Sequence, residues 1–315
     1  MKQPKSFEEG LTRLQELLTA LQDESTPLAQ SVKLYAEAAG LISYCKQTLD
    51  VAKLQINEID ASLLGGGKRI RAVLALAACE LSGTAPEKAL DYACALEMLH
   101  CYSLIHDDMP CMDNDDFRRG RPSCHKQFGE STALLAADAL VTAAFEVIAH
   151  ADLPAESRAE AAAILAKGGG ARGMLYGQEL DKHYETIRAT EDQLLELHRN
   201  KTGALIIVAV ELGCTAANAA PALRKALVQY AAEVGLVFQI VDDILDVTST
   251  TEELGKPVGS DADNDKTTFI TLYGLDGARA LAKQHNDAAM AALDGFGAQE
   301  DFLRLLAGEL LQRKK

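Results

Sequence analysis

The residues best suited to chemistry in this chain form two aspartate clusters that lie far apart in the sequence. The first contains Asp107, Asp108 and Asp113, and the second contains Asp242, Asp243 and Asp246. Two carboxylates ~4 Å apart repel by about 4 kcal/mol at an effective dielectric constant near 20. A fold tolerates such pairs when cations lie between them, and Mg²⁺ prefers hard oxygen ligands. The clusters therefore predict Mg²⁺ bridging to a diphosphate.

The first cluster is expected at the end of a helix that runs to about Met109, because Pro110 disfavours its continuation. Asp107 and Asp108 would then lie in the last turn, where the helix dipole disfavours negative charge. That placement is poor for stability and favours a metal role. His100 would lie on nearly the same face, two turns earlier. The alternative is a solvated acidic loop.

The second cluster also fits one helix face. Asp242 and Asp246 are four residues apart, and Gln239 lies three residues before Asp242. The preceding residues are apolar, so the carboxylates would top a buried helix. One such motif is weak evidence, but two aspartate-rich segments in an all-helical chain are a stronger signal.

Basic residues are the third element of the pattern. Lys68, Arg69 and Arg71 follow three glycines at an expected helix start, where exposed amides and cations favour an anion. An ordinary charged helix start is the alternative, and the segment lacks the ending of a P-loop. Further candidates for phosphate contacts are Arg118, Arg119, Lys201, Thr202, Lys256 and Lys266.

Composition narrows the class of protein. Acidic residues outnumber basic ones 46 to 31 in 315 residues, which argues against general nucleic-acid binding. Seven cysteines without a CxxC pair fit a reduced, cytoplasmic location. The apolar stretches are short or interrupted by charge, so we expect no membrane insertion.

The chain reads as helices nearly throughout, without a convincing strand. We expect an all-α bundle with a central cavity at residues 61–315, broken near Gly83, Pro154 and Gly169. Residues 1–60 are predicted to form a separate helical hairpin, with a capping box at Ser6 and a second helix starting at Pro27.

From about Ala61 onward the chain resembles the short-chain trans-polyprenyl diphosphate synthases, the farnesyl and geranylgeranyl group. The similarity is carried by collinear motifs, namely residues 96–110, 115–120, 177–181, 201–205, 235–246 and 254–257. It implies a terpenoid-synthase-type fold. It also implies a Mg²⁺-dependent prenyltransferase that joins isopentenyl diphosphate to an allylic diphosphate, dimethylallyl or geranyl.

The resemblance implies a role for each candidate residue. Mg²⁺, three ions per active site, would be held by Asp107, Asp113 and Asp242, with Asp108, Asp243 and Asp246 in support. The allylic diphosphate would be contacted by Arg118, Lys201, Lys256 and Lys266, with Thr202 and Gln239 lining its site. The diphosphate of isopentenyl diphosphate would be held by Lys68, Arg71, His100 and Arg119.

Product length depends on the helix that carries Asp107. Tyr102 and Ser103 lie one to two turns before it, and by resemblance an aromatic residue there marks enzymes that stop early. We therefore expect farnesyl diphosphate, with geranylgeranyl diphosphate as the alternative. A terpene cyclase of the same fold is a further alternative, but it needs no second diphosphate site. We also expect a homodimer.

Residues 6–57 resemble a different family, the small subunit of exonuclease VII. The match rests on residues 7–11, 27–35 and 49–52 and is shorter than the first. It implies a possible exonuclease VII large subunit as partner, with the synthase domain as a fusion. Alternatively, the hairpin replaces the synthase's usual N-terminal helices.

Overall fold

The computed structural model describes residues 69–248, 266–296 and 301–313. Contacts divide the chain into residues 1–67 and 68–315. The predicted N-terminal hairpin lies outside the described residues, and so do Lys68 and Lys256.

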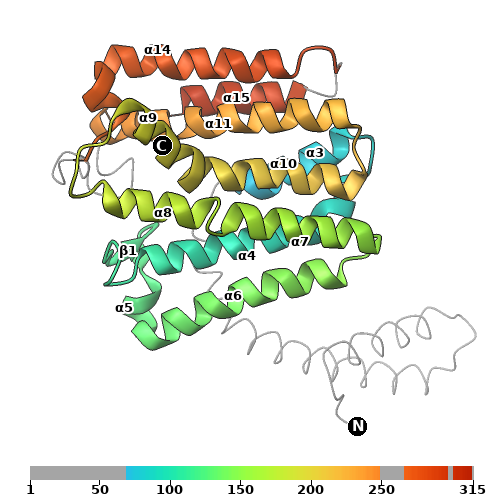
Figure 1. Cartoon of the computed structure of the whole chain (residues 1–315), viewed down its shortest axis with the longest axis horizontal. Helices are drawn as coiled ribbons and strands as arrows, with labels where there is room; N and C mark the ends of the chain where they lie inside the picture. The colour runs from blue at the N-terminus through green and yellow to red at the C-terminus, as the bar shows by residue number, and fades with distance from the viewer. Residues whose placement is uncertain (1–68, 249–265, 297–300, 314–315) are drawn as a thin grey trace, which may run out of the picture. The chain divides into compact units, whose positions relative to one another are not determined.

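Helices make up almost all of the described part of the chain (Figure 1). The α-helices are α3 (Ile70–Leu81), α4 (Leu90–Asp107), α5 (Cys124–Phe128), α6 (Glu130–His150), α7 (Ala155–Gly169), α8 (Met174–His183), α9 (Glu191–His198), α10 (Ala204–Ala217), α11 (Pro221–Thr248), α14 (Phe269–Ala292) and α15 (Asp301–Gln312). Short η1 (Pro86–Ala89) precedes α4, and the π-helical turn η2 (Arg199–Gly203) joins α9 to α10. The predicted all-α fold is confirmed.

Helix α10 lies at the centre of the bundle because it is apolar nearly all round. It contacts α3, α4, α7 and α11, and α11 in turn packs along α14 and α15. Alanines dominate the buried face of α6 and allow its close approach to α4. The core therefore fixes α4 and α11, the two helices that carry the aspartate clusters.

Two local features differ from the sequence predictions. Helix α4 ends at Asp107, two residues earlier than expected, with Asp108 as its C-cap. A small antiparallel hairpin, β1 (Phe117–Arg118) and β2 (Arg121–Pro122), follows the first cluster. Its two central residues, Arg119 and Gly120, have φ of 53° and 75°, as a two-residue primed turn requires. The sequence did not predict these strands, because two residues are too few to show the apolar–polar alternation of a strand.

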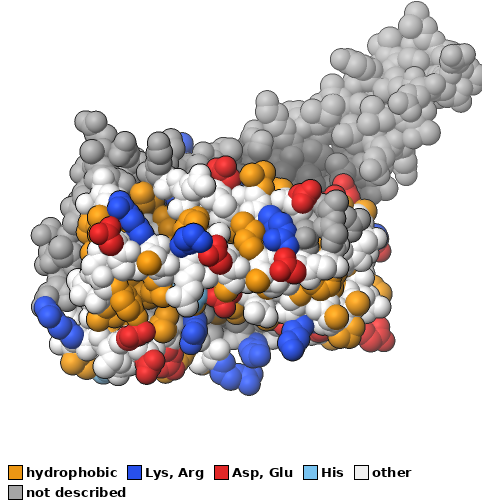
Figure 2. All heavy atoms as spheres, turned by 90° about the horizontal axis from the view of Figure 1, so that it is seen from above, with side chains coloured by type: hydrophobic (Ala, Val, Ile, Leu, Met, Phe, Trp, Pro, Cys, Tyr) orange, Lys and Arg blue, Asp and Glu red, His pale blue; other side chains and the backbone are white. Residues whose placement is uncertain are grey.

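The surface seen in Figure 2 carries acidic and basic side chains interspersed with apolar ones, without a broad basic patch on that face. Two described helical stretches, Glu130–His150 and Glu191–Ala217, are long and apolar enough to cross a membrane by length and composition. This is weak evidence, because core helices pass the same test, and 56% of the second window is buried.

Candidate active site

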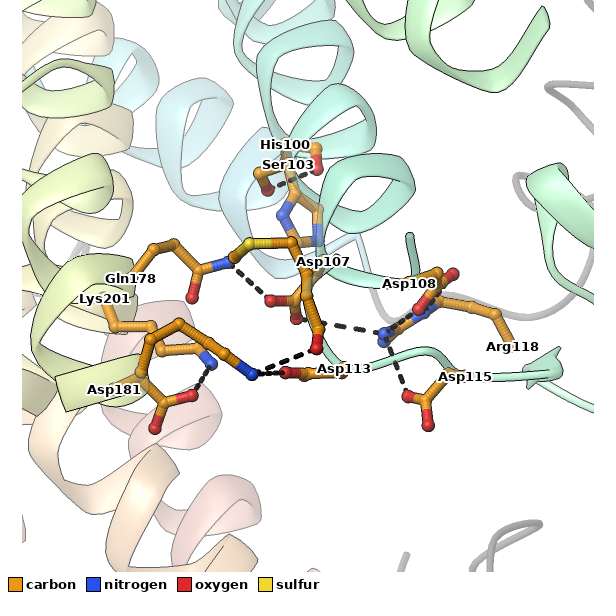
Figure 3. Close-up of polar contacts among 12 residues, drawn as sticks. His100, Ser103, Asp107, Asp108, Asp113, Asp115, Arg118, Gln178, Asp181 and Lys201 are labelled. Carbon is orange, nitrogen blue, oxygen red and sulfur yellow. Dashed lines mark hydrogen bonds and ion pairs between the residues drawn. The ribbon is translucent and has the colours of Figure 1, made fainter. Parts of the chain in front are cut away.

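The carboxyl end of α4 places the first two aspartates among polar partners from other segments (Figure 3). Gln178 of α8 donates a hydrogen bond of 2.7 Å from Nε2 to Asp107 Oδ1. Arg118 Nε lies 2.8 and 3.0 Å from the two carboxylate oxygens of Asp108, and its Nη2 also contacts that carboxylate. The β1–β2 hairpin thus folds Arg118 back onto the helix end.

The loop after α4 brings Asp113 back beside Asp107. Its backbone amide donates to the Asp107 carbonyl at 2.9 Å, and Met112 donates to the Met109 carbonyl at 2.8 Å. Asn114 closes the turn with φ of 53°. The turns that follow α4 therefore bring a third carboxylate, that of Asp113, to the place where Asp107 and Asp108 lie.

Helix α8 and the π-helical turn η2 form the opposite wall. Lys201 in η2 donates to Asp181 Oδ2 of α8 at 2.6 Å. The close approach depends on Gly177, because an added Cβ would meet the Lys201 amide nitrogen at 2.0 Å. π-Helical turns are rare and are frequent at functional sites. This one presents the Lys201 ammonium to the aspartates.

Burial sets the electrostatics of this wall. Burial raises the pKa of the Asp107 carboxyl, with Lys201 acting against that shift. Burial also disfavours the charge of Lys201, but Asp107 and Asp181 outweigh it and leave the pKa of Lys201 raised. Lys201 therefore remains protonated, with its ammonium held between carboxylates.

Sequence reasoning assigned no role to four residues of α8 and its end, Gln178, Asp181, Lys182 and Glu185. Carboxylate oxygens of Asp113, Asp181 and Glu185 lie within 4.8 Å of one another. Lys266 Nζ lies 3.7 Å from Asp181 and 3.6 Å from Glu185. The available signals were the motif at residues 177–181 and the three-residue spacing of Gln178 and Asp181, which puts both on one side of α8. Glu185 follows the end of that helix at His183.

The second aspartate cluster is divided among different partners. Asp243 Oδ2 accepts a 2.8 Å hydrogen bond from the buried backbone amide of Phe269, the first residue of α14. Asp242 contacts the guanidinium of Arg313, which also donates to the Phe238 carbonyl at 2.7 Å. Asp246 is 2% exposed. Asp243 thus fixes the start of α14, whereas Asp242 is 41% exposed at its side chain.

Two of the predicted allylic-site residues contact each other. Thr202 Oγ1 donates to Gln239 Oε1 at 3.0 Å, which joins η2 to α11. Helix α11 approaches η2 closely, since a Cβ on Gly235 would lie 3.0 Å from Gly203 Cα. Lys201, Thr202 and Gln239 therefore belong to one connected region.

A second basic group lies on α3 and α4. Arg71 Nη1 and His100 Nε2 are 3.2 Å apart, and Arg119 is near enough to influence both groups electrostatically. Burial lowers the pKa of Arg71 to about 10. Burial and the neighbouring Arg71 lower the pKa of His100 well below its ordinary value, so its imidazole is neutral. Glu97 is a nearby carboxylate that acts against the shift at Arg71, and it pairs with Arg69 at 3.3 Å. Because Arg69, Arg71 and Arg119 outnumber that carboxylate, the group suits an anionic ligand.

The predicted product-length residues lie in the core of α4. Tyr102 is 6% exposed and meets His106 edge to face at 5.6 Å between ring centroids. Ser103 donates to the His100 carbonyl at 2.7 Å. Tyr102 is thus a buried ring below the aspartates on their own helix.

The donor chemistry around Asp107 fits Mg²⁺. Every candidate ligand is a carboxylate oxygen, and Asp107 is held desolvated beside Asp113, which further raises its pKa. Neighbouring amide and cationic groups orient the carboxylates, as second-layer partners of metal sites do.

An all-α bundle that gathers carboxylates, lysines and arginines around the end of one core helix defines an enzyme of the isoprenoid synthase fold. The chain belongs to the polyprenyl synthetase family, whose model matches residues 54–300. It is therefore an enzyme that transfers prenyl groups. The family resemblance read from the motifs is confirmed. A second model, that of the exonuclease VII small subunit, matches residues 7–58.

Known relatives agree with this family. The chain is 41% identical over 89% of its length to a farnesyl diphosphate synthase of Haemophilus influenzae, of which it covers 94%. It is 42% identical over 82% of its length to that of Geobacillus stearothermophilus, of which it covers 88%. It is also 46% identical over 76% of its length to a chloroplastic geranylgeranyl pyrophosphate synthase of Capsicum annuum, of which it covers 66%.

Solved structures give the same picture. A geranyltransferase from Legionella pneumophila superposes with a TM-score of 0.73 at 33% identity, covering 98% of this chain and 96% of that one. A geranyltransferase from Helicobacter pylori, solved with magnesium and isoprenyl diphosphate, gives a TM-score of 0.71 at 30% identity. In that comparison 99% of this chain and 98% of the other are covered.

Proposed function

We propose that this protein condenses isopentenyl diphosphate with dimethylallyl or geranyl diphosphate to give farnesyl diphosphate. The observation that carries the proposal is the meeting of Asp107, Asp113 and Lys201 at the end of α4, close to the separate Arg71–His100 group. Two anion sites, one at the end of α4 and one two turns earlier between α3 and α4, are what a two-diphosphate reaction needs. A terpene cyclase would have no use for the second. The named relatives support the same choice.

On the allylic side, this chain's cations stabilise the leaving group. Arg118, Lys201 and Lys266 are placed to receive negative charge as the allylic carbon–oxygen bond breaks and its electron pair passes to the diphosphate. In the described structure these three cations are held by carboxylates, so they are already oriented. Thr202 and Gln239 line the same region, and Lys256 is assigned to it by its motif alone.

On the other side, Arg71, His100 and Arg119 would hold the diphosphate of isopentenyl diphosphate, together with Lys68. The double bond of that substrate attacks the allylic carbon and a proton is then lost. His100 is neutral and bonded to Arg71. Its role is therefore to bind and orient, and the released diphosphate accepts the proton.

Mg²⁺, three ions per active site, would be held by Asp107, Asp113 and Asp242, with Asp108 and Asp246 beside them. When bound, these ions would neutralise negative charge on the departing diphosphate.

The direct test is incubation of the full chain with labelled isopentenyl diphosphate, dimethylallyl diphosphate and Mg²⁺, followed by chromatography of the products. We expect a fifteen-carbon product and no turnover in EDTA. Near-normal activity in EDTA would contradict the proposed metal dependence, and the absence of any condensation product would contradict the function itself.

Product length provides a finer test. Tyr102 fills space in the core beneath Asp107, and an extra five-carbon unit cannot enter filled space without repacking. Tyr102→Ala should therefore lengthen the product to twenty carbons or more. Tyr102→Phe is the matched control and should keep the wild-type product. An unchanged product in the alanine variant would mean that other residues set the length.

We also propose a homodimer formed through α6. This helix is apolar, yet only 28% of its most apolar window is buried, and Leu134 and Leu135 are 46% and 66% exposed. Adjacent exposed leucines on a long apolar helix favour a protein partner. Light scattering should give twice the chain mass, and Leu135→Glu should yield a monomer. A wild-type monomer at micromolar concentration would rule this out.

A second function is favoured by the exonuclease VII small-subunit match at residues 7–58. We infer that residues 1–60 form a unit separate from the synthase at 61–315, able to bind an exonuclease VII large subunit in the cytoplasm. Co-purification of the full chain with that subunit from the source organism tests this. If the segment instead replaces missing synthase helices, deleting it should abolish solubility.

A further inference from the structure

Lys182 of α8 inserts its ammonium into the acidic group beside Asp107. Its Nζ lies 2.8 Å from Glu185 Oε1, 3.0 Å from the Met112 carbonyl and 3.3 Å from Asp113 Oδ1. Its side chain is 28% exposed, so the ammonium is partly shielded from water. The fold thus holds a fixed cation against one of the carboxylates assigned to Mg²⁺.

The loop that carries Asp113 does not depend on this lysine for its shape. Its turns are closed by backbone hydrogen bonds, including Asp113 N to the Asp107 carbonyl at 2.9 Å and Asn114 N to the Met109 carbonyl at 3.1 Å. The contact with Asp113 is therefore chiefly one of charge. The ion pair of Lys201 is instead with Asp181, and those of Lys266 are with Asp181 and Glu185.

A monovalent cation on a carboxylate weakens the attraction of that carboxylate for a divalent one, because the two positive charges repel at short range. Lys182 also has two other acceptors, the Met112 carbonyl and Glu185. It can therefore give up Asp113 without leaving its ammonium unpaired. These are the properties of an exchangeable counter-ion.

We propose that Lys182 competes with Mg²⁺ for Asp113 and so sets the Mg²⁺ concentration at which the site fills. This deepens the proposed function and depends on it. Lys182 is a positioning and tuning residue here, since it acts through Asp113.

The test compares two substitutions in the full chain. Lys182→Gln removes the charge but keeps a side-chain donor for the Met112 carbonyl, and Lys182→Arg keeps the charge. Mn²⁺ replaces Mg²⁺ as a paramagnetic probe, and its binding to the substrate-free protein is followed by electron paramagnetic resonance. Lys88→Gln is the matched control, because Lys88 lies before the other end of α4 and pairs with Asp152.

We expect Lys182→Gln to bind Mn²⁺ at least about threefold more tightly than the wild type, with Lys182→Arg and Lys88→Gln unchanged. The Mg²⁺ concentration for half-maximal turnover should fall in the same variant. Equal or weaker Mn²⁺ binding by Lys182→Gln would overturn the inference, even if the enzyme makes product normally. Failure of the proposed function would show separately, as a wild type that makes no product at any Mg²⁺ concentration.

Discussion

The two aspartate clusters look alike in sequence but are built differently. In the first, Asp107 and Asp108 end a helix, and their carboxylates meet side-chain donors, Gln178 and Arg118, from other segments. In the second, Asp243 is committed to the Phe269 backbone amide, while Asp242 meets Arg313 near the chain's end. The first cluster therefore lies among side chains of the proposed active site. In the second, Asp243 instead holds the start of α14 in place.

The difference follows from where each cluster lies on its helix. A helix end leaves its side chains open to a loop and to neighbouring helices, so α4 can direct two aspartates and Asp113 to one place. Helix α11 continues past its cluster to Thr248 and packs along α14. Asp243 of that cluster therefore faces the packed interface between α11 and α14, where a carboxylate needs a buried hydrogen-bond donor.

Substitution of Asp107 should have the largest effect on turnover. Asp107→Asn keeps the acceptor for Gln178 but removes the charge, so turnover should fall by about a thousandfold or more. Burial raises the pKa of Asp107. The folded state therefore binds the proton more tightly than the unfolded chain, and stability from this group is lost as pH rises past the unfolded pKa.

At pH 7 the ionised Asp107 thus destabilises the fold, and Asp107→Asn should raise the Tm. Product assays and calorimetry on the same preparation measure both effects. A variant that loses activity and also melts earlier would show that Asp107 stabilises the fold.

Asp243→Ala should produce a large loss of stability. Removing the carboxylate leaves the buried Phe269 amide without this acceptor, which costs about 1–3 kcal/mol. Asp243→Asn retains an acceptor oxygen and should recover most of that loss, as urea unfolding would show. Mn²⁺ binding by the asparagine variant should match the wild type. A loss of Mn²⁺ binding there would instead make Asp243 a ligand.

Arg313→Ala should have a smaller effect. The guanidinium lies 4.1 Å from the centre of the Phe238 ring and contacts Asp242, and loss of an ordered cation–π contact costs about 1 kcal/mol. The Asp242 side chain is partly exposed, so water still solvates its charge when Arg313 is removed. Arg118→Ala is the comparison, because it leaves the buried Asp108 carboxylate without Arg118 and should destabilise the protein more. Equal losses in urea unfolding would contradict the contrast between the clusters.

The effect of His198 appears only on acidification. It stacks on Phe269 at 5.3 Å between centroids, and burial lowers its pKa to about 3. Because the folded pKa is below the unfolded one near 6.5, this group's stability contribution is present above pH 6.5 and is lost as pH falls toward 3. His198→Phe keeps a stacked ring without titration. Its Tm should fall less than that of the wild type between pH 7 and pH 5.

The amino-acid sequence determined the helical class, the helix breaks and the motifs that define the family. Local preferences suffice for these, because apolar spacing, proline and glycine act over a few residues. The sequence also pointed to Asp107, Lys201 and Arg71, whose types and neighbours reveal their chemistry. It did not indicate Gln178, Asp181, Lys182 or Glu185 as a group, since nothing local connects α8 to a loop about seventy residues earlier.

Only the tertiary structure decided which partner each charge would have. A carboxylate in an Asp-Asp pair can bind a metal, an arginine or a backbone amide, and the choice depends on which segment folds against it. Gly177 permits α8 to touch η2, and the packing of α14 on α11 brings the Phe269 amide to Asp243. Such contacts depend on the close packing of distant segments, so they exist only once the bundle has formed.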